Sequence, residues 1–236
     1  MSTRNPLNIG AAARAVSNLG FPHLRVVNPY EASFREARSA VGAEPLLKRA
    51  QEFKSVVDAI ADCTLVVGTT AAHNRELHQP LKQLPQAGPL IRRALRSGRV
   101  ALLFGSEKRG LSNSDLSHCH WLLRIPTREE HGSMNLGQAV AVCLYELARM
   151  AGGKQSRAQR PDDNRRGGQA SAGELDRITE TLLDALRASG YFEPGTPAAK
   201  EEKVRRMVRR LNLSSADAET WQGMLRQILW KLERGK

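Results

Sequence analysis

The sequence has few of the residues that mark a secreted or membrane protein. Its three cysteines, Cys63, Cys119 and Cys143, are widely spaced and form no Cys-x-x-Cys pair. This argues against a disulfide framework or a zinc site, so we expect each to be a small buried apolar residue. No run approaches the ~18 apolar residues of a membrane span, and the N-terminus has no apolar stretch of a signal peptide. We therefore expect a cytoplasmic protein.

Several common catalytic motifs are also absent. Residues 105–112 resemble a phosphate-binding loop only superficially, because Leu111 follows the second glycine where that loop needs a lysine. No Gly-x-Gly-x-x-Gly opens a helix, no His or Cys cluster has metal-ligand spacing, and there is no Gly-x-Ser-x-Gly elbow. These absences argue against a nucleoside triphosphatase, a dinucleotide-dependent enzyme, a metalloenzyme and a serine hydrolase.

Positive charge is what the sequence has in excess. It contains 36 Lys and Arg against 24 Asp and Glu, a formal net charge of +12. Residues 1–150 hold 19 basic and 12 acidic side chains, and residues 151–236 hold 17 and 12, so both halves are basic. This favours a polyanionic partner, since each neutralised phosphate releases counterions. A charge that serves solubility alone is the alternative.

The first 150 residues alternate predicted helices and strands. An Ala-rich helix over residues 8–19 ends at Gly20. Further helices are predicted over residues 31–38, 55–61, 89–96 and 135–150, and short apolar strands over 24–27, 64–67, 100–104 and 121–125. The alternation predicts an α/β domain with a mostly parallel sheet, and strands without polar alternation are typical of strands covered on both faces.

The chain changes character after this domain. Residues 152–172 contain mainly Gly, Gln, Ser, Arg and Asp, which indicates a flexible linker between a first domain of residues 1–151 and a second of residues 173–236. Helical patterns over residues 174–188, 198–211 and 214–232 make the second domain a small all-helical one. Ser214 is the expected N-cap of the last helix.

Ligands of parallel sheets bind beyond the carboxyl ends of the strands. The segments that follow those ends here are residues 68–73, 105–113 and 126–135, all rich in Gly, Ser, Thr and Asn. We expect these three segments to form one pocket.

Three motifs, in order and with matching spacing, resemble those of the SpoU/TrmH class of RNA 2′-O-methyltransferases in the SPOUT superfamily. The first is Asn-Pro-Leu-Asn-Ile-Gly-Ala-Ala-Ala-Arg-Ala at residues 5–15. The second is Leu-Phe-Gly-Ser-Glu at residues 103–107, with Gly-Leu-Ser-Asn at 110–113. The third is Ile125-Pro126 followed by Gly-Ser-Met-Asn-Leu at residues 132–136. Residues after about 170 resemble the helical part of the TrmJ group, bacterial enzymes that modify cytidine or uridine 32 of tRNA.

The resemblance implies a fold, a reaction and partners. The fold is a parallel α/β sheet with a trefoil knot, in which the third motif and its helix thread through a loop of the chain. The reaction is S-adenosylmethionine-dependent methylation of a ribose 2′-hydroxyl in tRNA by a homodimer, without a metal. Similar proteins have a strand before the first motif, and we expect it to be missing because only residues 1–4 precede that motif.

The resemblance also assigns site residues. The methyl donor would be held by Thr69, Thr70, Ala71, Gly105, Ile125, Gly132, Ser133 and Met134. The reaction would use Arg14, Asn8, Glu107, Ser133 and Asn135. An arginine with a pKa above ~12 is a poor base, so Arg14 suits charge stabilisation of the alkoxide or a phosphate. Asn8 would orient Arg14, and Glu107 would pair with it from the same or another subunit. A surface cation, helix caps and a solvated loop acid are the alternative roles.

Basic residues near the C-terminus suggest an RNA contact. Lys203, Arg205, Arg206, Arg209 and Arg210 share one predicted helix, where they suit tRNA phosphates, as does Arg14. A solvated helix face is the alternative. Two other functions stay open: an rRNA 2′-O-methyltransferase of the same class, and a non-enzymatic RNA-binding protein on this scaffold.

Overall fold

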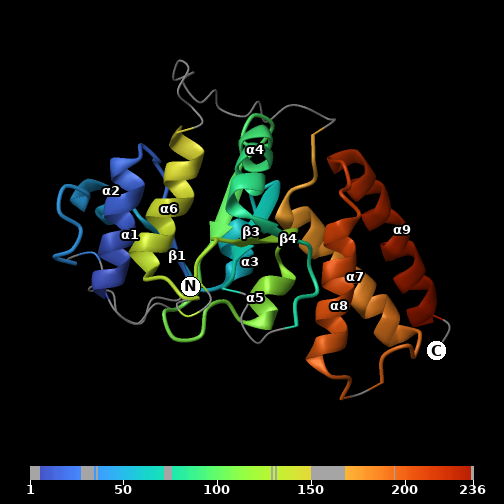
Figure 1. Cartoon of the computed structure of the whole chain (residues 1–236). Helices are drawn as coiled ribbons and strands as arrows, with labels where there is room; N and C mark the ends of the chain where they lie inside the picture. Colours follow the sequence, from blue (N-terminus) through green and yellow to red (C-terminus); the bar gives the residue numbers. More distant parts are fainter. Residues whose placement is uncertain are drawn as a thin grey trace.

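The structure is a computed structural model that describes residues 6–27, 35, 37–71, 76–128, 130, 132–149, 168–193 and 195–234. A four-stranded sheet at its centre has the order β4-β6-β3-β5 (Figure 1). Its strands are β3 (Leu65–Thr69), β4 (Leu81–Gln83), β5 (Val100–Leu103) and β6 (Trp121–Arg124). A second sheet pairs β1 (Arg25–Val27) with β2 (Gln51–Phe53), and every pairing is parallel. The predicted α/β class is confirmed.

Helices cover both faces of the central sheet. Val67 of β3 and Leu123 of β6 pack against α1 (Pro6–Asn18), α4 (Leu84–Ala94) and α6 (Leu136–Arg149). Their neighbours Val66 and Leu122 face the other way, toward α3 (Val56–Ile60) and α5 (Asn113–Ser117). Successive side chains of a strand point to opposite faces, so two buried faces explain why these strands lack polar alternation.

Helices α1 and α6 lie side by side at one end of the molecule (Figure 1). Small residues permit their close approach: a Cβ at Gly137 would lie 2.8 Å from the Cβ of Ala11. Ala12 and Ala15 of α1 lie in the same buried cluster as Val140 and Cys143 of α6. The first and third sequence motifs are therefore held against each other.

Three helices form the C-terminal part: α7 (Ala172–Ala188), α8 (Ala198–Arg210) and α9 (Ser215–Arg234). The Ser214 hydroxyl accepts a hydrogen bond from the Asp217 amide at 3.1 Å, which confirms the predicted N-cap. The start of α7 is fixed to the first part, because the Ala172 amide donates to the Cys63 carbonyl at 2.7 Å.

The predicted linker is shorter at its C-terminal end than we expected. Ala170 and Ala172 are fully buried, so residues 168–172 belong to the packed structure. The boundary was predicted from composition, and two alanines do not raise the apolar content of this segment enough to indicate burial. The rest of the predicted linker, residues 152–167, lies outside the described residues.

Other differences from the predicted elements have local causes. Helix α4 begins at Leu84 rather than at Pro89; Pro85 occupies its first turn. Pro89 lies inside the helix on an exposed side, where water can satisfy the carbonyl that loses its donor. Helix α2 (Glu44–Lys48), α5, β2 and β4 were not predicted; each has three to five residues and no apolar run or period that distinguishes it from a loop. The predicted helix over residues 31–38 falls largely outside the described residues.

The three cysteines are free and buried, as predicted. Burial raises the pKa of each thiol to about 12, so none is a reactive thiolate at neutral pH. Among the described residues, no helix combines the length and the apolarity needed to cross a bilayer.

Candidate active site

The loops predicted to bind the methyl donor meet at the carboxyl edge of the central sheet. Strand β3 lies between β5 and β6, so the segments that follow these three strands are neighbours. The Thr69 hydroxyl donates to the Leu103 carbonyl at 2.8 Å, and the Thr70 amide donates to the Leu123 carbonyl at 3.0 Å. These bonds tie the ends of all three strands together. The structure thus brings Thr69, Thr70, Gly105 and Ile125 to one edge.

Gly105 is required by the close approach of two backbone segments. A Cβ at this position would lie 1.9 Å from the carbonyl carbon of Gly110 and 2.2 Å from the Leu111 nitrogen. The loop between them closes through hydrogen bonds between the backbones of Ser106 and Gly110, and Gly110 has a φ of +66°. The resulting edge is made of backbone and half-buried apolar groups such as Ile125. Such a surface fits an adenosine moiety, which needs a flat apolar slot with backbone donors and acceptors.

Three polar side chains, one from each motif, form a single network. The Asn8 amide donates to Glu107 Oε1 at 2.7 Å, and the Asn135 amide donates to Asn8 Oδ1 at 3.2 Å. Asn135 Oδ1 also accepts from the Gly137 amide at 2.9 Å and so caps α6. Asn8, Glu107 and Asn135 were all predicted as site residues. They lie far apart in the sequence, yet the fold fixes each against the others.

Arg14 does not join this network. Its side chain is exposed and makes no hydrogen bond or ion pair with the residues that the structure describes. It follows Asn8 by six positions, about 9 Å along α1 and on another side of the helix. The expected pairing of Glu107 with Arg14 within one chain is therefore wrong: Glu107 accepts from Asn8 instead. The guanidinium of Arg14 faces outward, available to a molecule outside the chain.

The remaining predicted donor residues lie near the three strand ends. Gly132 is half-buried, and Ser133 and Met134 are exposed just before α6. Ala71 is exposed where the described part of the segment after β3 ends.

Comparison with known proteins agrees with this geometry. The model of the SpoU rRNA methylase family matches residues 1–145. The chain belongs to the SpoU methylase family. The methyl donor of SpoU methylases is S-adenosylmethionine.

Curated relatives are similar over nearly the whole chain. The tRNA (cytidine/uridine-2′-O-)-methyltransferase TrmJ of Klebsiella pneumoniae is 31% identical over 97% of this chain and 93% of its own length. The TrmJ of Yersinia pestis strain Pestoides F is 30% identical over 97% of this chain and 89% of its own. The similarity thus extends beyond the SpoU domain into the C-terminal helices.

Solved structures show the same fold. TrmJ from Z. mobilis ZM4 superposes with a TM-score of 0.82 at 29% identity, covering 96% of this chain and 95% of its own. A probable methylase family protein from Haemophilus influenzae gives a TM-score of 0.59 at 26% identity, with 100% and 96% covered.

The basic helix of this SpoU methylase does not present one continuous cationic face. Arg209 is only 1% exposed, and its guanidinium donates to Asp176 at 2.7 Å and to the Ala172 carbonyl at 3.2 Å. Its prediction as an RNA contact is therefore wrong. The reason is that the face of α8 carrying Arg209 packs on α7.

The other cations of α8 differ in their surroundings. Arg205 donates to the Ser117 hydroxyl of α5 at 3.1 Å. The Arg206 side chain is half-buried and lies 3.6 Å from Glu202. Lys203 and Arg210 are exposed, so these two remain the clearest candidates for contact with a phosphate.

Asp176, the buried partner of Arg209, is not among the residues predicted from the sequence. It lies on α7 among the buried residues Leu175, Ile178 and Thr179. An acid inside a buried helical stripe is the signal that could have identified it, since buried carboxylates are nearly always paired.

Proposed function

We propose that this protein transfers a methyl group from S-adenosylmethionine to a ribose 2′-hydroxyl of tRNA, at cytidine or uridine 32 of the anticodon loop. The observation that carries the proposal is the network of Asn8, Glu107 and Asn135 beside the loops at the carboxyl edge of the sheet. The TrmJ relatives, whose names specify cytidine or uridine 2′-O-methylation of tRNA, support the substrate. Position 32 rests on the resemblance to the TrmJ group.

Methyl transfer to a ribose hydroxyl depends on the positioning of the reactants more than on a strong acid or base. When bound, S-adenosylmethionine supplies an electrophilic methyl group, and its displacement requires the attacking oxygen in line with the breaking C–S bond. Arg14, whose side chain is exposed, would stabilise the developing 2′-alkoxide or an adjacent phosphate. Asn8, held at both ends of its amide, fixes the start of α1 relative to Glu107 and Asn135.

The predicted donor residues fit this arrangement. Backbone groups at Thr69, Thr70 and Ala71 and at Gly105 would hold the adenosine part. Ile125, with Gly132, Ser133 and Met134, would close the other side, and Ser133 would also hydrogen-bond to the donor or the target ribose. The trefoil knot belongs to the same proposal: α6 follows the third motif and packs on α1.

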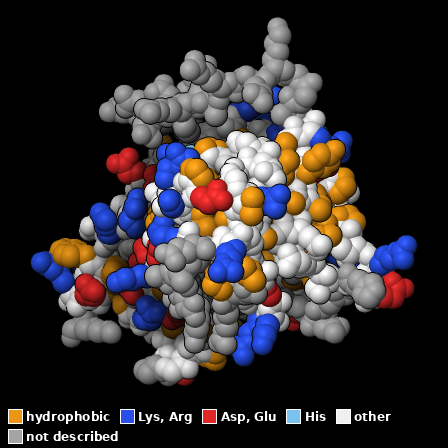
Figure 2. Space-filling view, turned by 90° about the vertical axis from the view of Figure 1, so that its left-hand side faces the viewer, with side chains coloured by type: hydrophobic (Ala, Val, Ile, Leu, Met, Phe, Trp, Pro, Cys, Tyr) orange, Lys and Arg blue, Asp and Glu red, His pale blue; other side chains and the backbone are white. Residues whose placement is uncertain are grey.

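A homodimer through α1 and α6 is part of the proposal. Leu7 on α1 and Val142 and Tyr145 on α6 are exposed apolar residues, at 52%, 37% and 60%. Figure 2 shows hydrophobic side chains among the charged ones on this end of the molecule. A second copy on this face would lie close to Arg14, so one tRNA could contact both protomers. Because tRNA is the substrate, we place the reaction in the cytoplasm.

The test begins with calorimetric titration of S-adenosylhomocysteine, followed by methyl transfer to total tRNA and to ribosomal RNA with mapping of 2′-O-methyl positions. We expect donor binding and a single modified position, nucleotide 32, in tRNA. Methylation of rRNA alone would support the rRNA enzyme, in keeping with the description of the family that matches residues 1–145. Absence of donor binding, with RNA binding retained, would support the non-enzymatic RNA-binding protein.

A further inference from the structure

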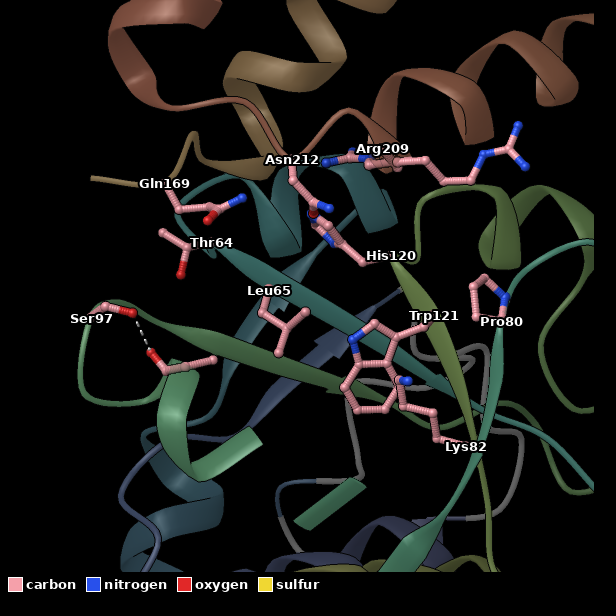
Figure 3. Close-up of a pocket in the computed structure, with 12 residues that line it drawn as sticks. Thr64, Leu65, Pro80, Lys82, Ser97, His120, Trp121, Gln169, Arg209 and Asn212 are labelled. Atoms are coloured by element: carbon pink, nitrogen blue, oxygen red, sulfur yellow. Dashed lines mark hydrogen bonds between the residues drawn. The ribbon is translucent and has the colours of Figure 1, made fainter. Parts of the chain in front are cut away.

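A cavity lies at the edge of the central sheet opposite the candidate active site, between the sheet and the C-terminal helices (Figure 3). It has a volume of about 350 Å³. Leu65, Lys82 and Trp121, at or near the starts of β3, β4 and β6, line one side, and the segment between α8 and α9 lines the other. Because parallel strands all begin at one edge, this cavity is separated from the candidate active site by the length of β3, roughly 16 Å.

The cavity is lined by cations and by no acid. Lys82, Arg209 and Arg210 contribute to its wall, and none of its described lining residues is Asp or Glu. Asp176 neutralises Arg209, whereas Lys82 and Arg210 have no acidic partner among the described residues. Lys82 Nζ lies 5.9 Å from the ring of Trp121, another wall residue. The two uncompensated charges favour an anionic ligand.

His120 contributes a buried, neutral imidazole to this wall. Its Nδ1 accepts from the Val66 amide at 3.1 Å, so the proton of the neutral ring is on Nε2. Burial and the charge of Arg209 lower the pKa of His120 to about 4, which keeps the ring neutral at pH 7. Nε2 is buried and has no hydrogen-bond partner among the described residues, and neither has Nε of Arg209. Both nitrogens are inaccessible to solvent, so they lie behind the cavity surface and contribute no open donor to it.

We propose that this cavity binds a backbone phosphate of the RNA substrate, with Lys82 and Arg210 as the charge partners. The inference rests on the proposed function and deepens it, because it places a second RNA contact where the C-terminal helices meet the sheet. A contact at the edge opposite the methyl-transfer loops suits a macromolecule that spans both. The cavity volume is near the lower end for ligand sites, and Trp121 offers an aromatic surface of the kind on which an adjacent base stacks.

The experiment measures equilibrium binding of tRNA between about 0.05 and 0.3 M salt. This range brackets about 0.1 M, where the Debye length is about 10 Å. The test variant is Lys82→Ala/Arg210→Ala. The control, Lys48→Ala/Lys54→Ala, removes the same charge from exposed residues outside the cavity. Loss of one phosphate contact should weaken binding about tenfold at 0.1 M salt and reduce the salt slope by about one. The control should change both quantities much less, and S-adenosylhomocysteine affinity should be unchanged in both variants.

Urea unfolding of the Lys82→Ala/Arg210→Ala variant separates ligand binding from folding, because neither side chain is fully buried. We expect weaker tRNA binding with a normal urea-unfolding midpoint at pH 7. Equal binding of tRNA by wild type and the Lys82→Ala/Arg210→Ala variant, or equal loss in the control pair, would overturn the inference.

Two further arms identify the source of the phosphate and separate this inference from the proposed function. Titration with AMP and with inorganic phosphate should give binding far weaker than that of tRNA. Tight AMP binding that the test variant loses, with tRNA binding unchanged, would make the cavity a mononucleotide site and overturn the inference. Methylation of tRNA by the wild-type protein tests the proposed function independently, because it can succeed whether or not the variants bind tRNA normally.

Discussion

The buried ion pair between Arg209 of α8 and Asp176 of α7 gives the sharpest prediction about stability. Both side chains are nearly inaccessible, at 1% and 6% exposed, and lie 2.7 Å apart. His118 Nδ1 approaches the same carboxylate at 3.3 Å from the first part of the chain. The pair therefore stands where the C-terminal helices contact the rest of the molecule.

Replacing one partner should cost far more than replacing both. Arg209→Met would leave Asp176 buried without its main cation, a loss of about 3–5 kcal/mol in the free energy of unfolding. Arg209→Met/Asp176→Leu removes both charges and fills similar volume, and such replacements are often neutral or stabilising. We therefore expect the double variant to be more stable than either single variant.

Urea unfolding at pH 7, followed by circular dichroism, measures these differences. Lys203→Met, an exposed change on the same helix, is the matched control and should stay within about 0.5 kcal/mol of wild type. An Arg209→Met variant as stable as this control would contradict the prediction, since a buried uncompensated carboxylate could not then be present. A double variant less stable than both single variants would show that packing, not charge, dominates the site.

Three further predictions concern the active site and the effect of pH. Arg14→Ala should keep S-adenosylhomocysteine affinity within a few-fold while methyl transfer falls by about 10²-fold or more; equal loss of both would make Arg14 structural. Gly105→Ala should reduce donor affinity at least about tenfold, because its Cβ would overlap the Gly110 backbone, whereas Gly223→Ala, with no atom within 4 Å of the new Cβ, should not; calorimetry decides. The pKa of His120 is about 4 in the folded chain, against an ordinary value of 6.5. Between pH 4 and pH 6.5 this histidine is therefore protonated in the unfolded chain and neutral in the folded chain. Stability should therefore fall by up to about 3 kcal/mol as pH decreases from 6.5 to 4, and His120→Asn should remove most of this loss. Below about pH 4, Asp176 adds a further loss: burial opposes its charge, but the pairing with His118 and Arg209 lowers its pKa overall. A flat profile between pH 7 and 5 would contradict the reading of His120.

Much of the architecture was predictable because its signals are local. The Ala-rich helix that ends near Gly20 and the apolar strands at β3, β5 and β6 were identified within a few residues. The same holds for the three C-terminal helices, whose apolar periods are long enough to read. Short elements such as β4 and α5 carry no period of their own. They form because neighbouring strands and helices offer hydrogen bonds and buried surface at those positions.

The candidate site shows the same division. Asn8, Glu107 and Asn135 were selected by resemblance, and the structure brings them within hydrogen-bond distance. Within one chain Glu107 does not pair with Arg14, because a helix turns by about 100° per residue and carries Arg14 to another side of α1. The prediction for helix α8 failed in a similar way, because Arg209 is buried rather than exposed to RNA. A run of cations does not show which of them will be buried against a neighbour.

Periodicity, composition and ordered motifs were enough to predict the class of fold, the order of the longer elements, the basic charge and the family. Which polar groups meet could be seen only in the folded chain. Packing buried Arg209 against Asp176, placed Asn8 between Glu107 and Asn135, and left the buried Nε2 of His120 without a hydrogen-bond partner among the described residues. The contribution of a charge or a hydrogen-bond donor to the free energy of folding depends on its burial and its partners. Those are set by packing between segments far apart in the chain.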